Sequence, residues 1–212
     1  MIVTVDGPAA SGKGTLAHAL ARHLKLPHLD TGLLYRAVGA AVIAAGKRPD
    51  DPAAAAAAAR AVDLGHLDSG KLSGKDLGEA ASVVAAIPEV RAALLEFQQA
   101  FARRPGGAIL DGRDTGTVIA PGADAKIFVT AAVERRAERR HRELVASGET
   151  VSFDQVLVDL NRRDARDAGR AIAPLKPAPD AVLLDTTDLD IEAAFRAALA
   201  IVEAARAGRG RG

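Results

Sequence analysis

A glycine-rich stretch near the start of the chain most constrains its fold. Gly7, four further residues and then Gly12-Lys13 stand between the apolar run Ile2-Val3-Thr4-Val5 and a helical pattern over residues 16–24. This spacing in a strand–loop–helix context is typical of a phosphate-binding loop, whose glycines let successive backbone N–H groups converge on an anion. The helix dipole and the Lys13 ammonium add positive charge. A nucleoside triphosphate is therefore expected to bind through Gly7, Pro8, Ala9, Ala10, Ser11, Gly12, Lys13, Gly14 and Thr15.

Short apolar segments alternate with helical patterns along the rest of the chain. Strands are predicted at residues 2–5, 27–29, 108–110, 126–130 and 181–184. Helices are predicted at residues 16–24, 33–45, 53–62, 79–86, 88–103, 132–146, 153–168 and 191–207. This alternation predicts an α/β fold, with a five-stranded parallel sheet and helices on both of its faces. The polar, glycine-rich stretch 65–78 leaves little room for a packed element.

Polar residues follow four of the five predicted strands. They are Asp6-Gly7, Asp30-Thr31-Gly32, Asp111-Gly112-Arg113-Asp114 and Asp185-Thr186. In parallel sheets, ligands bind beyond the carboxyl ends of the strands. We therefore expect the functional site at this edge of the sheet.

The composition excludes several classes of protein. A chain of 212 residues can bury one substantial core, so a single domain with lobes is expected. A net charge of +1 with five Phe, one Tyr and no Trp argues against a nucleic-acid partner. No apolar run approaches the roughly 20 residues that span a bilayer, and residues 1–6 lack the basic region of a signal peptide. The absence of cysteine excludes disulfides and thiolate metal sites and fits a cytoplasmic location.

Arginines recur where they can meet a second anionic substrate. Phosphoryl transfer requires neutralisation of charge on several oxygens, so a kinase needs cations for its acceptor as well as its donor. The candidates are Arg36, Arg91, Arg113, Arg163 and Arg170, with Arg135, Arg139 and Arg142 on the helix before Arg163. Arg163, Asp167 and Arg170 have the spacing i, i+4, i+7 and share one helix face. A mobile lid explains this segment, and a solvated helix pair with surface ion pairs is the alternative.

The five histidines show no chemical pattern. They are His18, His23, His28, His66 and His141, and no pair of them has metal-ligand spacing. No Ser-His-Asp arrangement of a hydrolase is evident either. All five are expected to be surface residues or satisfied core residues.

Several longer motifs give the chain a family resemblance. They are Val5-Asp6-Gly7-Pro8 with Ser11-Gly12-Lys13-Gly14-Thr15, Leu29-Asp30-Thr31-Gly32 with Tyr35-Arg36, Ala81-Ser82-Val83-Val84-Ala85 with Pro88 and Arg91, Asp111-Gly112-Arg113-Asp114 with Gly116-Thr117-Val118, Lys126-Ile127-Phe128, Arg163-Asp164 with Arg166-Asp167, and Arg170-Ala171-Ile172-Ala173-Pro174-Leu175. Through them the chain resembles the bacterial cytidylate kinases over almost its whole length. The resemblance implies a P-loop kinase fold with acceptor-binding and lid segments. It also implies a monomer that transfers the γ-phosphoryl group of ATP to CMP or dCMP with Mg²⁺.

The resemblance implies roles for the residues that would bind ATP and its metal ion. Lys13 and the loop amides would hold the ATP phosphates, together with Arg139. The catalytic cations would be Lys13, Arg113, Arg163 and Arg170. Asp111, at the end of its strand, suits a metal ion or metal-bound water. The position after Lys13, which is usually Ser or Thr in phosphate loops, is Gly14, and the hydroxyl comes one residue later at Thr15. This arrangement resembles the nucleoside monophosphate kinases, and whether Thr15 touches the metal is open.

On the acceptor side, the resemblance implies three groups of contacts. The cytosine edge, which offers an amine, a ring nitrogen and a carbonyl, would be read by Ser82, Arg91 and Asp114. The acceptor phosphate would be held by Arg36, Arg113 and Arg170, with Thr31 near it. Asp167 would accept hydrogen bonds from the sugar hydroxyls, and Arg163 would reach the transferring group.

One stretch departs from longer members of the family, which carry an extra small sheet before the Ala-Ser segment. Residues 63–78 are too short and polar for three good strands, so we expect a shortened insert. The expected division of the single domain 1–212 is a core of residues 1–35, 104–131 and 172–207, an acceptor-binding lobe of about 36–103, a lid of about 132–171 and a disordered tail at 208–212.

Two alternatives stay open. Another small-molecule kinase on the same fold would act on adenylate, uridylate or shikimate. A GTP-dependent switch would have no acceptor, but its guanine-reading Asn-Lys-x-Asp motif is missing, since the only asparagine is Asn161, followed by Arg162-Arg163-Asp164. Rates with ATP and each nucleoside monophosphate would distinguish these possibilities.

Overall fold

Five strands form one parallel sheet at the centre of the computed structural model, which describes residues 1–68 and 70–209. The strands are β1 (Ile2–Asp6), β2 (His28–Asp30), β3 (Ala108–Gly112), β4 (Ala125–Thr130) and β5 (Val182–Asp185), in the spatial order β2-β3-β1-β4-β5. Val5 of β1 lies opposite Asp111 of β3 and Ile127 of β4. The sheet therefore aligns the carboxyl ends of its strands, as the alternating pattern predicts.

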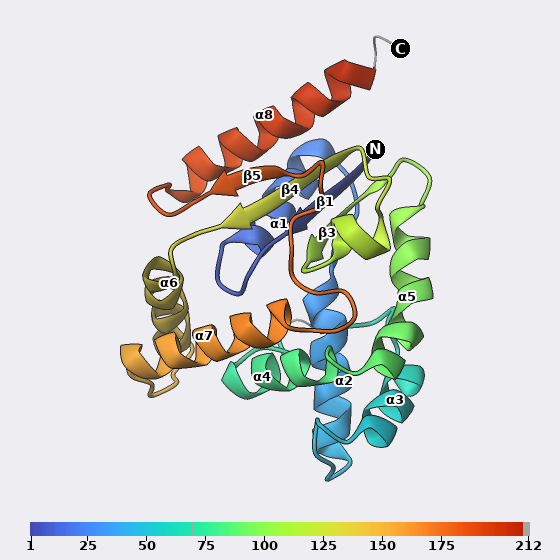
Figure 1. The fold of residues 1–212 in the computed structure, drawn as a ribbon, viewed down its shortest axis with the longest axis vertical. Helices are drawn as coiled ribbons and strands as arrows, with labels where there is room; N and C mark the ends of the chain where they lie inside the picture. Colours follow the sequence, from blue (N-terminus) through green and yellow to red (C-terminus); the bar gives the residue numbers. More distant parts are fainter. Residues whose placement is uncertain (69, 210–212) are drawn as a thin grey trace.

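Helices cover both faces of this sheet (Figure 1). They are α1 (Lys13–Leu24), α2 (Thr31–Ala44), α3 (Pro52–Ala61), α4 (Lys75–Val84), α5 (Pro88–Ala102), α6 (Val133–Ala146), α7 (Phe153–Ala168) and α8 (Ile191–Arg209), with one π-helical turn, η1 (Thr115–Ile119). Alternate residues of β3 enter separate cores, because successive side chains of a strand point to opposite faces. Ile109 packs with residues of α1 and α8, whereas Ala108 and Leu110 pack with α2 and α5.

A third, smaller core joins α6 and α7 to the loop after β1. Ala137 and Leu144 of α6 pack with Val156 and Leu160 of α7, and Ala9 of the loop joins them. Both helices are otherwise polar, so burial of one apolar stripe holds this pair together. The pair lies beside α4, which Figure 1 places below the sheet.

Several helix boundaries differ from the sequence-based prediction, and three of them have a clear physical cause or consequence. Helix α4 begins at Lys75, inside the stretch expected to carry no packed element, because Lys75 N donates to the distant Glu149 side chain at 3.1 Å. Helix α2 begins at Thr31, since Asp30 caps it by accepting from Leu33 N at 3.2 Å. Helix α8 extends to Arg209, so residues 208 and 209 are not the predicted disordered tail. Residues 210–212 of that tail, and Ser69, lie outside the described residues.

The stretch between α3 and α4 contains turns and no strand in the residues that the structure describes. Across the described residues, no helix is long and apolar enough to cross a membrane.

Candidate active site

The loop between β1 and α1 requires glycine at two points. A Cβ on Gly7 would lie 2.1 Å from the carbonyl oxygen of Val129, so no larger residue fits there. Gly12 has φ +88° at the start of α1, a left-handed conformation that glycine adopts without strain. Lys13 is the first residue of α1, and its Nζ donates to the carbonyl of Pro8 at 3.4 Å. The predicted phosphate loop thus forms from residues 7–15, at the carboxyl edge of the sheet.

The environment of Lys13 disfavours its charged form. Burial and the positive charge of Arg113 lower the pKa of Lys13 to about 7, and the nearby carboxylates of Asp111 and Asp30 only partly oppose that fall. The lysine that the sequence marks for phosphate binding is therefore near its titration midpoint at neutral pH. An incoming phosphate would restore its positive charge.

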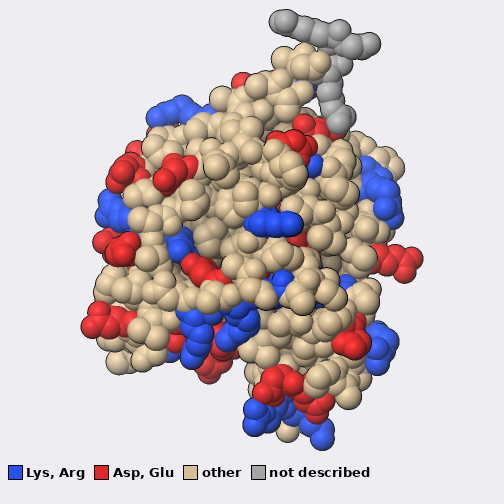
Figure 2. Space-filling view, in the orientation of Figure 1, with Lys and Arg blue, Asp and Glu red and all other residues tan. Residues whose placement is uncertain are grey.

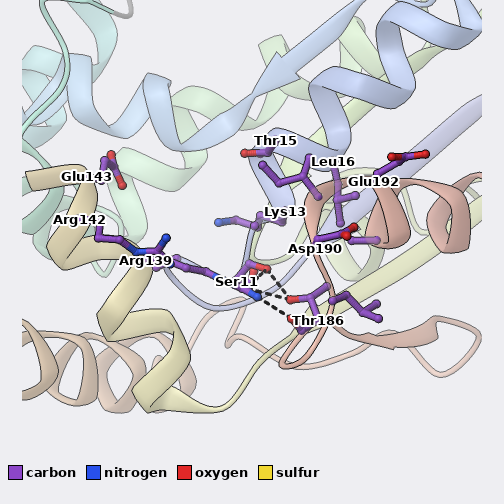
Figure 3. Close-up of a pocket in the computed structure, with 16 residues that line it drawn as sticks. Ser11, Lys13, Thr15, Leu16, Arg139, Arg142, Glu143, Thr186, Asp190 and Glu192 are labelled. Carbon is purple, nitrogen blue, oxygen red and sulfur yellow. Dashed lines mark hydrogen bonds between the residues drawn. The ribbon is translucent and has the colours of Figure 1, made fainter. Parts of the chain in front are cut away.

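A cavity of about 800 Å³ opens beside the loop (Figure 3). Its walls come from the loop and the start of α1, from α6, and from the segment after β5. Arg139 of α6 donates to the carbonyl of Thr186 at 2.5 Å and to its hydroxyl at 3.1 Å, and it reaches the carbonyl of Ser11 at 3.5 Å. The cavity has the size of a small-molecule site, with a cation fixed at its wall.

The other two arginines predicted on α6 are exposed side chains. Arg135 is exposed and pairs with Glu138 at 2.9 Å. Arg142 is exposed at the cavity wall. The arginine of α6 that sequence reasoning missed is Arg136, which is buried, donates to the carbonyl of Ala9 at 3.2 Å and pairs with Asp164 at 2.7 Å. Arg136 ties the two helices to the loop.

A second cluster of arginines surrounds the buried carboxylate of Asp167. Arg113 Nε donates to its Oδ2 at 2.9 Å, Ser82 donates to its Oδ1 at 3.1 Å, and Arg163 Nε lies 4.0 Å from Oδ2. Arg170 Nε donates to its backbone carbonyl at 3.2 Å. Burial opposes ionisation of Asp167, but the charges of these arginines hold its pKa below the ordinary value. The structure thus joins α4, α7 and the segment after β3 at one acidic centre.

Two hydrogen-bond donors of the same cluster have no partner in the part of the chain that the structure describes. Burial and the charge of Arg113 lower the pKa of Arg163 to about 10, so it stays protonated at neutral pH. Arg163 Nε and Arg170 Nη2 are buried and have no hydrogen-bond partner among the described residues. Because an unsatisfied buried donor is costly, these two atoms suit anionic oxygens of a ligand.

Arg91 and Asp114 form a buried ion pair next to this cluster. Arg91 also donates to the carbonyl of Ala85 at 3.4 Å and lies over the Tyr35 ring at 5.6 Å, and Arg170 reaches the same carbonyl at 3.5 Å. Burial raises the pKa of the Asp114 carboxyl, although the charge of Arg91 opposes the rise. Arg91 and Asp114 thus lie next to Arg170 and the Asp167 cluster.

The two remaining acceptor-side candidates make backbone contacts. Arg36 is half-buried and donates to the carbonyl of Leu72 at 3.1 Å, in the stretch before α4. Thr31 is buried and donates to the carbonyl of Asp111 at 2.8 Å. Both lie near the carboxyl ends of β2 and β3, and the structure engages both side chains with the backbone.

Sequence reasoning missed His28 as a member of the site. Its Nε2 lies 2.7 Å from Asp111 Oδ1, because β2 and β3 are neighbours in the sheet and Asp30 is in register with Asp111. The order of strands in a sheet cannot be read from the local sequence of one strand. No sequence pattern therefore indicated that His28 and Asp111 would be neighbours. The other oxygen of Asp111 lies toward α1, 3.7 Å from the point where a Cβ on Gly14 would stand.

Asp111 provides a test of fit for a metal ion. In the described residues, no cluster of three or more His, Asp or Glu side chains could hold a metal by itself. Mg²⁺ does not need such a cage, since it keeps several waters and binds through one or two carboxylates plus substrate phosphates. Asp111 Oδ2 and the hydroxyl of the exposed residue Thr15 are hard oxygen donors, so the chemistry of these two residues fits that mode of binding.

The positive charge of the site is local. On the face seen in Figure 2, acidic and basic side chains are interspersed, and the chain as a whole has a net charge of +1. A global field would not attract a large polyanion, whereas the buried arginines suit a small phosphorylated ligand.

Comparison with known proteins adds independent information. The family profile described as Cytidylate kinase matches residues 3–204. A protein named Cytidylate kinase from Xanthobacter autotrophicus is 64% identical over 209 residues, which cover 99% of this chain and 100% of the relative. Another of that name from Methylocella silvestris is 62% identical over 205 residues, or 97% of this chain and 95% of the relative. A solved gluconokinase from Sinorhizobium meliloti has a TM-score of 0.53 at 16% identity, and the match covers 100% of this chain and 97% of the gluconokinase chain. This likeness supports the fold alone.

Proposed function

Because the chain belongs to the cytidylate kinase family and has its phosphotransferase activity, we propose that it transfers the γ-phosphoryl group of ATP to CMP or dCMP, giving ADP and CDP or dCDP. One observation carries this proposal. The phosphate loop and the arginines around Asp167 lie at the same carboxyl edge of the sheet, close enough for the charges of Arg113 and Arg163 to lower the pKa of Lys13. The proposed donor and acceptor sites therefore share one electrostatic environment.

ATP is proposed to bind with its phosphates on the loop of residues 7–15 and its nucleoside in the adjoining cavity. The loop amides and Lys13 would neutralise the phosphate oxygens, which is the main requirement of phosphoryl transfer. Arg139 would close the donor side, since it already bridges α6, Ser11 and Thr186. The α6–α7 pair would act as the lid that excludes water.

The acceptor phosphate is proposed to bind to Arg36, Arg113 and Arg170. The unpartnered Nη2 of Arg170 supports this role, and the unpartnered Nε of Arg163 supports a contact to the transferring group. Asp167 would accept from a sugar hydroxyl while it keeps these arginines oriented. No proton transfer by a protein group is needed, because the acceptor phosphate oxygen is already ionised at neutral pH.

The cytosine base is proposed to be read by Ser82, Arg91 and Asp114. The exocyclic amine of cytosine donates to a carboxylate, whereas uracil presents a carbonyl at that position and would be repelled. The burial of Arg91 and Asp114 strengthens this discrimination, since an unpaired polar group there is costly.

Asp111 and Thr15 are proposed to hold Mg²⁺, with His28 fixing the Asp111 carboxylate from behind. Bound Mg²⁺ would neutralise charge on the ATP phosphates. A monomer and a cytoplasmic location are proposed from the family resemblance. Neither a nucleic acid nor a membrane is a proposed partner.

A coupled assay with ATP and each monophosphate tests the proposal. CMP and dCMP are expected to be phosphorylated far faster than AMP, GMP and UMP, and equal rates with AMP would contradict the cytidylate assignment. Asp114→Ala should lower the ratio of kcat/KM for CMP over UMP by about tenfold or more, while the Kd for ATP changes little. Normal discrimination by this variant would disprove the base-reading role.

A further inference from the structure

Asp6 is a buried carboxylate outside the proposed ATP and cytidylate contacts. It ends β1 immediately before the phosphate loop and is 5% exposed. Its Oδ1 accepts from the backbone N–H of Thr115 at 2.9 Å and from the Thr115 hydroxyl at 2.8 Å. Its Oδ2 accepts from the N–H of Gly116 at 2.8 Å. Three donors from one short segment thus converge on this one side chain.

These donors belong to the segment that carries two acceptor-side residues. Arg113 and Asp114 directly precede Thr115, and the chain then turns into η1. A backbone hydrogen bond from Gly7 N to the carbonyl of Gly112, at 3.3 Å, adds a second link between the two segments. The phosphate loop and the proposed base-reading carboxylate are therefore linked through Asp6, which is far from Asp114 in the chain.

The close approach of the two segments depends on Gly116. A Cβ at that position would stand 2.9 Å from Thr4 Oγ1 and 3.4 Å from Asp6 Oδ2. The glycine lets its backbone N–H reach the carboxylate, and the segment is pressed against β1. The contact is therefore short and buried.

Stability alone does not explain why a buried, ionised carboxylate joins these two segments. Burial disfavours the charged form, and well-packed apolar residues of similar volume often stabilise such a contact as well or better. Burial raises the pKa of Asp6 to about 6 against the effect of its three hydrogen bonds, so the charged form still predominates at neutral pH. What a carboxylate adds over apolar packing is direction, because each lone pair fixes one donor.

We propose that Asp6 is a positioning residue, which fixes the segment of Arg113 and Asp114 relative to the phosphate loop and so sets the register between acceptor and donor. This inference rests on the proposed base-reading role of Asp114. Misplacement of a reacting group by about 1 Å can lower a rate by about 10²-fold. A small shift of residues 112–116 would therefore affect acceptor choice and turnover more than ATP binding.

The test combines Asp6→Asn with Asp114→Ala. Asn has the same shape but presents an NH₂ group to one of the three donors. Discrimination is measured as the ratio of kcat/KM for CMP and UMP at saturating ATP, in the wild type, both single variants and the double variant. Asp6→Asn is expected to lower the ratio by about tenfold, and to lower it by less than twofold when Asp114 is already Ala. The ATP Kd of Asp6→Asn should stay within about threefold of the wild type.

The outcomes separate the two proposals. If Asp114→Ala discriminates like the wild type, the base-reading role is wrong and the inference about Asp6 falls with it. If Asp114→Ala loses discrimination but Asp6→Asn keeps it, only the inference is overturned. Equal losses from Asp6→Asn on both backgrounds would also overturn it, because a general destabilisation acts independently of Asp114.

Variants at Thr115 decide the question if Asp6→Asn does not fold. Thr115→Val removes only the hydroxyl donor and keeps the shape of the side chain, so discrimination should fall by about threefold. Thr115→Ser restores the hydroxyl and should return the ratio to within twofold of the wild type. If Thr115→Val discriminates like the wild type, the proposal is overturned.

Discussion

Binding of ATP should draw a proton onto Lys13. Because the pKa of Lys13 is lowered to about 7, the free protein holds this side chain about nine-tenths neutral at pH 8 and about one-tenth neutral at pH 6. The phosphates bind the charged form. We therefore expect uptake of about 0.9 proton per ATP at pH 8 and about 0.1 at pH 6 from this group. Since the lowered pKa removes charge as the pH rises, the Kd for ATP should increase by up to about tenfold per pH unit above 7.

Isothermal titration calorimetry in two buffers of different ionisation enthalpy measures this uptake directly. At pH 8 the terminal phosphate of ATP is almost fully ionised, since its second pKa is about 6, and it contributes little. Lys13→Arg is the matched control, because a guanidinium stays charged and should take up no proton. An uptake below about 0.2 proton for the wild type at pH 8, or an equal uptake for the control, would refute the argument.

Two further predictions concern stability and the contact between α7 and α4. Arg91→Ala leaves Asp114 buried without its partner and should lower the free energy of unfolding by about 3–5 kcal/mol, measured by urea denaturation. The double variant with Asp114→Ala should lose less unfolding free energy than Arg91→Ala alone. An equal or larger loss in the double variant would argue against a buried pair. Glu79→Gln removes the partly exposed ion pair with Arg166, whose atoms lie 2.6 Å apart, so the free energy of unfolding should fall by less than about 1 kcal/mol. Hydrogen exchange in α7 should increase, and the increase should be smaller in 0.5 M salt. Unchanged exchange would show that this pair does not hold the helices together.

The sequence by itself determined the fold class, the family and the phosphate loop. The loop is contained in nine consecutive residues, and its glycines, lysine and following helix act locally. The alternation of apolar runs and helical patterns was enough to predict a parallel sheet, because hydrophobic periodicity reports burial segment by segment. The roles of the individual arginines remain predictions, although the structure brings those of α7 and of the segment after β3 together.

Only the tertiary structure decided how those residues meet. Asp167 bonds to Ser82 and Arg113, which lie 85 and 54 positions away in the chain, and His28 meets Asp111 because β2 adjoins β3. The start of α4 depends in the same way on Glu149. Each of these contacts follows from strand order and from the docking of α7 on α4, which local propensity does not encode. The local pattern produced the proposed phosphate loop, and long-range packing determined which side chains lie near it.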